Sequence, residues 1–120
     1  MSDERPDRPD RRVVNIHQAG YRVYDMEGPV QEDMGWLPLS YDANGNGCYA
    51  IRMAPGAETI EHTHAGVEDY LILEGELIES DGRVLKVGDF VHYDAGSRHN
   101  SRTETGCLLI GFDWGKPEKR

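Results

Sequence analysis

The 120-residue sequence predicts an all-β protein, either a sandwich or a small barrel. Short segments rich in Val, Ile, Leu and Tyr recur roughly every ten residues, with turn residues between them. No window of the sequence has the 3.6-residue period of an amphipathic helix. With 14 glycines and 38% hydrophobic residues, the composition suits a turn-rich globular domain better than a disordered chain.

The apolar segments are the expected strands. They are residues 13–17, 21–25, 36–40, 47–54, 69–73, 76–79, 83–86, 90–93 and 107–113. Glycine-containing turns separate them, and the clearest is Ser-Asp-Gly at residues 80–82, which predicts a hairpin. In the last segment, Leu108, Ile110 and Phe112 alternate on one face, which we expect to belong to the core.

The chain divides into one expected domain and two short ends. Residues 1–12 alternate Asp, Arg and Pro with no apolar residue after Met1, which predicts a disordered tail. Residues 13–115 form the expected barrel, and residues 116–120 are expected to fray. No apolar run approaches the roughly eighteen residues of a membrane span, and the first residues are unlike a signal peptide. We therefore expect a cytoplasmic protein without a membrane partner.

The charge distribution argues against nucleic acid as a partner. The formal net charge is −9, and residues 13–115 hold only six Lys and Arg against seventeen Asp and Glu. Such an acidic body repels a phosphate backbone and an anionic membrane surface. A small molecule is the expected ligand.

Two of the five histidines, His62 and His64, lie two residues apart. Side chains of a strand alternate with a period of two, so these imidazoles are expected on one face. Glu68 follows four residues later and begins its own alternation with Tyr70 and Ile72. If that face lines the barrel interior, Glu68 faces the two imidazoles across a hairpin.

A bound metal would explain why such side chains converge. Buried carboxylates and imidazoles are costly to desolvate unless they are paired or ligated. His99, which follows residues 90–93 and a turn at Gly96, is the best placed further ligand. Three imidazole nitrogens and one carboxylate oxygen suit one divalent transition metal, namely Fe, Mn, Ni, Co or Zn. Asp69 offers a competing carboxylate, which we expect to be solvated on the opposite face of its strand.

These residues also stand in the spacing of a known family. The first cupin motif, G-x5-H-x-H-x3-E-x6-G, is matched at every fixed position. The positions are Gly56, His62, His64, Glu68 and Gly75. The second motif is matched more loosely, at Gly88, Gly96 and His99. Asp94 and Thr103 stand where that motif has proline and asparagine.

Over residues 35–114 the chain resembles the cupins related to the C-terminal domain of the anti-sigma factor ChrR. The segments that carry the likeness are Gly-Trp-x-Pro at 35–38, Leu-Glu-Gly at 73–75, Gly-Ser-x-His at 96–99 and Gly-Cys at 106–107. The resemblance implies a double-stranded β-helix, or jelly-roll barrel, that holds a metal through the four residues above. Some members of the group bind metal through three histidines alone, so direct ligation by Glu68 stays open.

The same group contains small dioxygenases that cleave diketones and related compounds. The resemblance therefore implies an Fe(II) dioxygenase-like enzyme that acts on an oxygenated carbonyl compound or another bidentate anionic small molecule. A non-enzymatic domain that senses a ligand or metal is one alternative, and a non-oxidative sugar or uronate isomerase-type cupin is another. Residues 1–34 contain one His and no Cys, so a complete anti-sigma factor with a zinc-binding domain is not expected. Cupins commonly associate in pairs, which implies a homodimer.

Four further residues are substrate-binding candidates, namely Tyr49, Arg52, Tyr70 and His92. Tyr49 and Tyr70 either pack in the core or donate a hydrogen bond to a ligand. Arg52 either faces solvent or reaches inward to hold an anionic group. His92 either lies at the surface or stands behind the metal ligands. The sequence assigns no residue a catalytic role.

Overall fold

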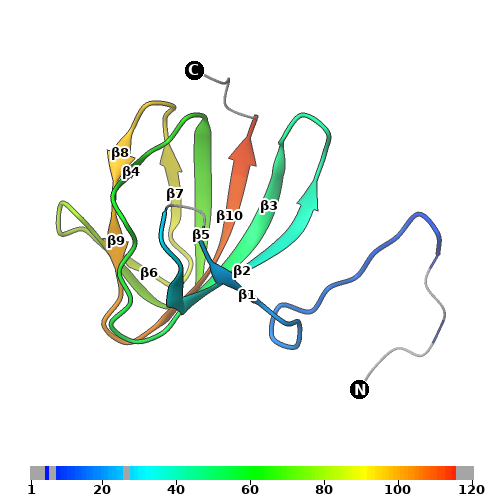
Figure 1. The fold of residues 1–120 in the computed structure, drawn as a ribbon, viewed down its shortest axis with the longest axis horizontal. Coiled ribbons are helices and arrows are strands. Elements are labelled where there is room, and N and C mark those ends of the chain that lie inside the picture. The colour runs from blue at the N-terminus through cyan, green and yellow to red at the C-terminus, as the bar shows by residue number, and fades with distance from the viewer. Residues whose placement is uncertain (1–4, 6–7, 26–27, 116–120) are drawn as a thin grey trace.

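A computed structural model describes residue 5, residues 8–25 and residues 28–115 as an antiparallel sheet curled into a half-barrel (Figure 1). All regular elements of this described part are strands, which confirms the all-β prediction. The strands are β1 (Arg22–Tyr24), β2 (Gln31–Tyr41), β3 (Gly47–Met53), β4 (His62–Thr63), β5 (Val67–Glu79), β6 (Val84–Lys86), β7 (Phe90–Tyr93), β8 (Arg98–His99), β9 (Ser101–Arg102) and β10 (Cys107–Trp114).

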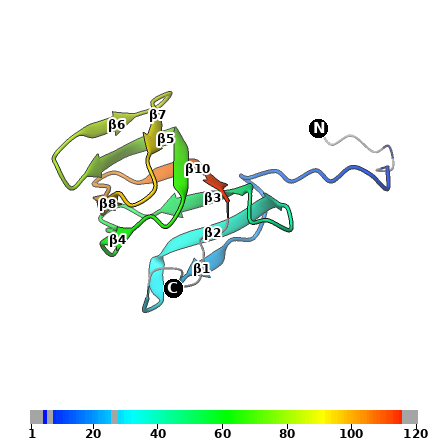
Figure 2. The ribbon, with the colours of Figure 1, turned by 90° about the horizontal axis from the view of Figure 1, so that it is seen from above.

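The strand order explains where a site can form. Across the curled sheet the strands follow the order β1-β2-β3-β10-β5-β6, and β7 and β9 also pair with β5. β4 and β8 form a separate two-stranded ladder. Seen from above, the large sheet is an arc, and the β4–β8 ladder lies across its open side (Figure 2). Residues of that ladder therefore face the concave side of the large sheet.

β5 connects the two parts of the sheet. Its first half pairs with β10 and β7, and its second half pairs with β6 and β9. The sequence predicted two strands here, at residues 69–73 and 76–79, but the structure has one continuous strand. The break in the apolar pattern comes from Gly75, which has a φ of 75° and lies beside a register shift in the pairing with β10. A Cβ at Gly75 would overlap the carbonyl oxygen of Gly106, so only glycine fits.

The core lies on the concave face of the sheet. Tyr49, Ile51 and Met53 alternate along β3 and are buried with Cys107 and Leu109 of β10. Strand residues spaced by two share a face, so these side chains all point into the curl. Burial of these apolar groups is the main stabilising contribution that this part of the sequence makes.

The face of β10 predicted to belong to the core is the outer face. Leu108, Ile110 and Phe112 alternate with Cys107 and Leu109, and only the latter two belong to the core cluster. Alternation distinguishes the two faces of a strand, but it does not tell which face is concave when both carry apolar residues. Leu108 is nevertheless only 1% exposed, and Ile110 and Phe112 are half-buried.

Residues 13–17, predicted as a strand, form no strand, and all of them except Ile16 are exposed. Tyr21, a little further along, packs against Gly35 of β2 and lies 5.3 Å below the guanidinium of Arg52. His17 comes within 3.5 Å of a Glu74 carboxylate oxygen. Arg52 and Glu74 are the neighbours of Leu108 on the two adjacent strands, so Tyr21 and His17 contact the residues that flank Leu108.

The predicted end segments are only partly described. In the predicted tail at residues 1–12, residues 1–4 and 6–7 lie outside the described residues. The whole predicted fraying end, residues 116–120, lies outside them as well. Within the described part, the Arg12 guanidinium donates to the Leu39 carbonyl at 3.0 Å. The domain boundaries remain predictions. No helix long and apolar enough to cross a membrane occurs among the described residues.

The close contact at Gly75 predicts an unequal pair of glycine substitutions. Gly75→Ala should lower the free energy of unfolding by about 3 kcal/mol or more, because the new Cβ meets backbone in a left-handed conformation. Gly82→Ala should cost about 1 kcal/mol, because Gly82 also has a positive φ but faces open space. Urea denaturation measures both, and equal losses would contradict the role given to the Gly106 carbonyl.

Candidate metal centre

The pairing of β4 with β8 sets His62 directly opposite His99. His64 follows β4 at once and continues the ladder: its N–H donates to the Ser97 carbonyl at 2.8 Å, and its own carbonyl accepts from the Gly96 N–H at 2.7 Å. Gly96 supplies the positive φ of the turn before β8. The three imidazoles therefore come from two neighbouring segments whose relative position is set by backbone hydrogen bonds.

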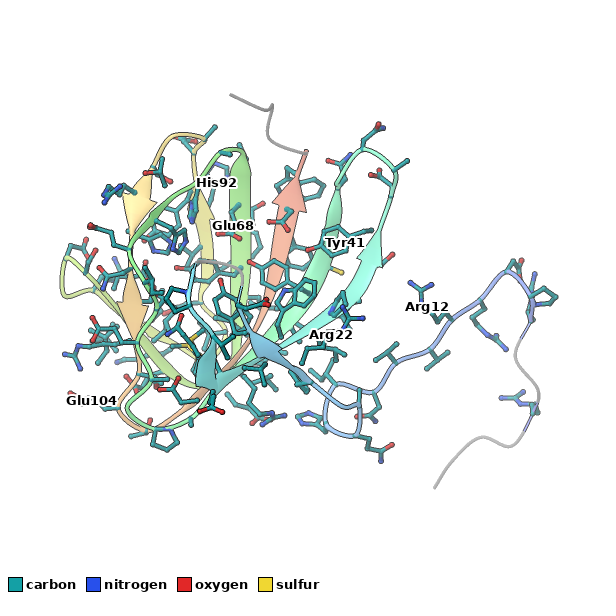
Figure 3. The ribbon with its side chains drawn as sticks, in the orientation of Figure 1. Arg12, Arg22, Tyr41, Glu68, His92 and Glu104 are labelled. Atoms are coloured by element: carbon teal, nitrogen blue, oxygen red, sulfur yellow. The ribbon has the colours of Figure 1, made fainter. Side chains whose placement is uncertain are left out.

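Four potential ligand atoms lie within 4.8 Å of one another on the concave side of the sheet. The Nε2 atom of His64 lies 2.8 Å from Oε1 of Glu68, 2.9 Å from Nε2 of His99 and 3.2 Å from Nε2 of His62. His64 and His99 are each only 6% exposed. Figure 3 shows Glu68 on β5 in the middle of the curl. The structure thus brings together all four residues that the sequence selected.

The outer nitrogen of each imidazole, Nδ1, has a partner of its own. The partner of His62 is the Ile60 carbonyl at 2.9 Å. The partner of His64 is the Ser97 hydroxyl at 3.1 Å, and the partner of His99 is the Glu79 carboxylate at 2.8 Å. A carbonyl and an ionised carboxylate can only accept. His62 and His99 therefore carry their proton on Nδ1 and turn an Nε2 lone pair toward the centre.

This set of donor atoms fits a cation. Lone pairs of His62 and His99 and an oxygen of Glu68 all face Nε2 of His64, which can carry only one proton. One N–H cannot satisfy three acceptors, whereas a positive ion between the four atoms can. Neutral imidazoles together with a carboxylate are ligands that metal ions use in proteins. The four residues could therefore hold a metal ion.

Tyr49 orients the carboxylate of this cluster. Its hydroxyl donates to Oε2 of Glu68 at 2.5 Å, which leaves Oε1 for the imidazole side. Gly111 of β10 makes room, because a Cβ there would overlap the Tyr49 ring. Burial and the Glu68 charge raise the pKa of Tyr49 well above its usual value, so the hydroxyl keeps its proton. Although burial raises it, hydrogen bonds from His64 and Tyr49 hold the pKa of Glu68 below its usual range.

Asp113 is a further acid near the cluster that the sequence interpretation left within a core strand. Its Oδ2 atom accepts a hydrogen bond from the Tyr41 hydroxyl at 2.7 Å. Burial raises the pKa of Asp113 to about 6; the Tyr41 hydrogen bond opposes this shift, and the negative charge of Glu68 adds to it. The carboxylates of Asp113 and Glu68 thus make this side of the cluster acidic.

Two spaces adjoin the four residues, and both are lined by His62 and Glu68. The inner cavity has a volume of about 50 Å³, and its apolar lining is Met34, Ile51, Met53, Leu77 and Leu109. The outer cleft is open and has a volume of about 470 Å³; Trp36, Tyr41 and Asp113 are among its lining residues. The cluster therefore lies between a small apolar cavity and a larger cleft whose lining includes Asp113.

The substrate-binding candidates divide between the two faces of the sheet. Tyr49 and Tyr70 are buried on the concave face and line the inner cavity. The Tyr70 ring stacks on His99, with centroids 6.4 Å apart and an interplanar angle of 19°. Arg52 lies on the outer face over Tyr21 and lines neither space, which is the outward alternative of the two that the sequence left open. The reason is strand alternation, because Arg52 lies between Ile51 and Met53, which both face inward.

His92 lies outside both spaces and pairs with carboxylates (Figure 3). Its Nδ1 atom is 2.6 Å from Asp69 and its Nε2 atom is 2.9 Å from Asp94. The Trp114 indole N–H donates to the second oxygen of Asp69 at 2.5 Å. Asp69, expected to be solvated, is thus only 8% exposed. Because both its oxygens are bonded on the far side of β5, Glu68 is the carboxylate that faces the imidazoles.

Sequence reasoning missed Glu79, the partner of His99 Nδ1. This residue lies at the end of β5 and is 6% exposed. Although burial raises it, hydrogen bonds from His99, Ser101 and Tyr93 lower the pKa of Glu79. Strand alternation could have found it, because Glu79 shares the inward face with Leu77 two residues before it.

A curled sheet that gathers three imidazoles and a carboxylate on its concave side is the arrangement expected of a cupin. The family model of the ChrR cupin-like domain matches residues 12–115. The chain therefore belongs to the ChrR cupin-like domain family. The predicted resemblance and the cupin barrel fold are confirmed. A comparison with curated proteins finds no match.

Solved structures share the fold at low sequence identity. A cupin-like protein from Ralstonia eutropha JMP134 is 23% identical, with a TM-score of 0.64 over 70% of this chain and 56% of that chain. A chain of the Rhodobacter sphaeroides complex of SigE with the anti-sigma ChrR is 16% identical, with a TM-score of 0.69 over 83% of this chain and 52% of that one. The present chain thus spans little more than half the length of these two.

An acetylacetone dioxygenase from Acinetobacter johnsonii is similar over most of its chain. It is 14% identical, with a TM-score of 0.70 over 99% of this chain and 90% of that chain. Identities this low establish the common fold and leave activity to be inferred from the site.

The convergence of the imidazoles predicts the effect of removing two of them. The double substitution His62→Ala with His64→Ala should reduce bound metal from about one ion per chain to less than about a tenth of that, because two of four ligands are lost. Metal analysis of purified protein after dialysis measures this. His17→Ala is the control, because His17 lies outside the cluster. Unchanged metal content in the double variant would exclude the centre.

The pairing of His92 predicts a pH-dependent contribution to stability. Hydrogen bonds that His92 donates to Asp94 and Asp69 raise the pKa of His92 above its ordinary value of 6.5. The stabilisation is therefore fully present below pH 6.5 and is lost as the pH rises through the raised value. His92→Gln should thus be less stable than the parent near pH 6 and equally stable near pH 9. Urea denaturation across this range is the measurement, and a difference that grows with pH would contradict the pairing.

Proposed function

We propose that the chain is a small metal-dependent enzyme of the dioxygenase-like cupin type that acts on an oxygenated carbonyl compound. The observation that carries the proposal is the convergence of His62, His64, Glu68 and His99 with outward-bonded Nδ1 atoms. Membership of the ChrR cupin-like domain family and the shared fold with an acetylacetone dioxygenase support it.

The resident ion is proposed to be one divalent transition metal, namely Fe, Mn, Ni, Co or Zn, because these accept nitrogen and oxygen ligands together. When bound, such an ion would act as a Lewis acid that stabilises negative charge on substrate oxygens, and iron would add reactivity toward O2. His62, His64, Glu68 and His99 would hold it. Direct ligation by Glu68 belongs to this proposal.

The two spaces beside the cluster suggest the shape of the substrate. A polar end with two oxygen atoms would lie at the cluster, and a short apolar end would enter the inner cavity of about 50 Å³. A cavity of this volume has room for only a small alkyl group between the side chains that line it. The outer cleft provides the way in. A compact 1,3-diketone or hydroxy-ketone meets both conditions.

Tyr49 and Tyr70 are the residues proposed to act beside the ligands. Tyr49 holds the second oxygen of Glu68, which keeps the carboxylate from rotating away from the imidazoles. Tyr70 forms one wall of the inner cavity against His99, where its ring would pack on the apolar end of a substrate. Both hydroxyls stay protonated, because burial raises the pKa of each.

A second candidate is a non-enzymatic domain that senses a ligand or metal. The observation that favours it is the match to the family of ChrR, which is described as an anti-sigma and was crystallised with SigE. A third is a non-oxidative sugar or uronate isomerase-type cupin, which the same ligand set would serve. A cytoplasmic location and a homodimer stay predictions from the sequence.

Oxygen consumption tests the first proposal. The iron-loaded protein should consume O2 in proportion to the loss of acetylacetone or a hydroxyacetophenone, because oxidative C–C cleavage uses one O2 per substrate. An oxygen electrode with product analysis measures this, and the His62→Ala/His64→Ala variant serves as the control. No uptake by fully loaded protein would exclude the dioxygenase activity. Turnover that persists under nitrogen would favour the isomerase, and capture of a stoichiometric protein partner released by metal would favour the sensor.

A further inference from the structure

Glu79 is a second buried carboxylate behind the candidate centre. It lies at the end of β5, eleven residues after Glu68, and its side chain is 5% exposed. Its Oε1 atom accepts from Nδ1 of His99 at 2.8 Å. The cluster of four ligand residues does not include it.

Glu79 accepts two further hydrogen bonds from side chains. The Ser101 hydroxyl donates to Oε2, and the Tyr93 hydroxyl donates to Oε1. Ser101 is also the backbone pairing partner of Glu79 between β9 and β5. Three donors from three directions therefore hold both carboxylate oxygens, although no Lys or Arg forms an ion pair with this group among the described residues. A buried carboxylate without a cationic side chain calls for another source of positive charge.

The three Nδ1 partners differ in charge. Ile60 offers a neutral carbonyl and Ser97 a neutral hydroxyl, whereas Glu79 offers an anion. A carboxylate bonded to the far nitrogen of a metal-ligating histidine fixes the ring and makes its other nitrogen a stronger donor. The Nδ1 atom of His99 thus bonds to a charged group, Glu79, which is itself buried.

We propose that Glu79 is a positioning residue of the metal centre, which orients His99 and neutralises the charge of the bound ion. This proposal rests on the proposed metal centre. Among a divalent ion and its four proposed ligands, Glu68 leaves one positive charge, and Glu79 adds a negative charge behind His99. The centre then attracts anions less strongly than three neutral imidazoles and one carboxylate would, which favours substrates that arrive as neutral carbonyl compounds.

Two opposite changes in one variant test the proposal. Glu79→Gln should weaken Co²⁺ binding by about 10- to 100-fold, because His99 loses its charged partner. The same variant, once loaded with cobalt, should bind azide about threefold more tightly or better, because a nearby negative charge is gone. Visible absorption of the cobalt-loaded protein reports both affinities, with a competing chelator for the metal titration.

Two variants separate orientation from charge. Glu79→Asp keeps the charge but shortens the side chain, so it should weaken Co²⁺ binding and leave azide affinity within about twofold of the parent. Glu76→Gln is the matched control on the same strand, because Glu76 bonds to Thr103 and Thr105 and lines neither space beside the cluster. It should change neither affinity. If circular dichroism shows that Glu79→Gln does not fold, the Co²⁺ and azide affinities of Glu79→Asp test the proposal instead.

The outcomes distinguish two failures. A parent protein that binds no Co²⁺ would overturn the metal centre, and the role of Glu79 with it. A parent that binds Co²⁺ while Glu79→Gln matches it in both affinities would overturn the role of Glu79 alone. A loss of metal affinity without any gain in azide affinity would overturn the charge-neutralising part, because a purely structural defect predicts that result.

Discussion

The candidate centre depends on the pairing of two very short strands. β4 and β8 contribute only two residues each, yet their register sets His62 opposite His99 and carries His64 beside them. So short a ladder has little stability of its own. It is held because the large sheet curls behind it and because β5 supplies partners for the imidazoles, with Glu68 at the centre and Glu79 behind His99.

Several polar groups inside the curl form hydrogen bonds with one another. Tyr49 bonds Glu68, and Tyr93 and Ser101 bond Glu79. Buried networks of this kind are costly to leave half-satisfied, so each member restricts the conformation of the next. As a result, residues outside the ligand set fix the orientation of the side chains at the centre. Fixed ligand side chains are what give a metal site a defined geometry.

Much of the site was predictable because its residues obey strand alternation within a spacing that resembles the cupin motif. Arg52 and Asp69 show what that reasoning left open. Both lie on the outer face, which strand alternation allowed for Arg52 and predicted for Asp69. Tyr21 packs under Arg52, and Asp69 is buried where Trp114 and His92 bind it. Their partners come from segments distant in sequence, and no local pattern reports which distant segment will cover a strand face.

The sequence by itself determined the all-β class, the turns, the spacing of the candidate ligands and the acidic character of the chain. Only the tertiary structure decided which face of each strand became the interior, because both faces of β10 carry apolar side chains and curvature is a property of the whole sheet. The tertiary structure also decided that a carboxylate, Glu79, lies behind the candidate metal centre. Glu79 is an ordinary strand residue in the sequence, and it acquires a role because folding buries it against an imidazole.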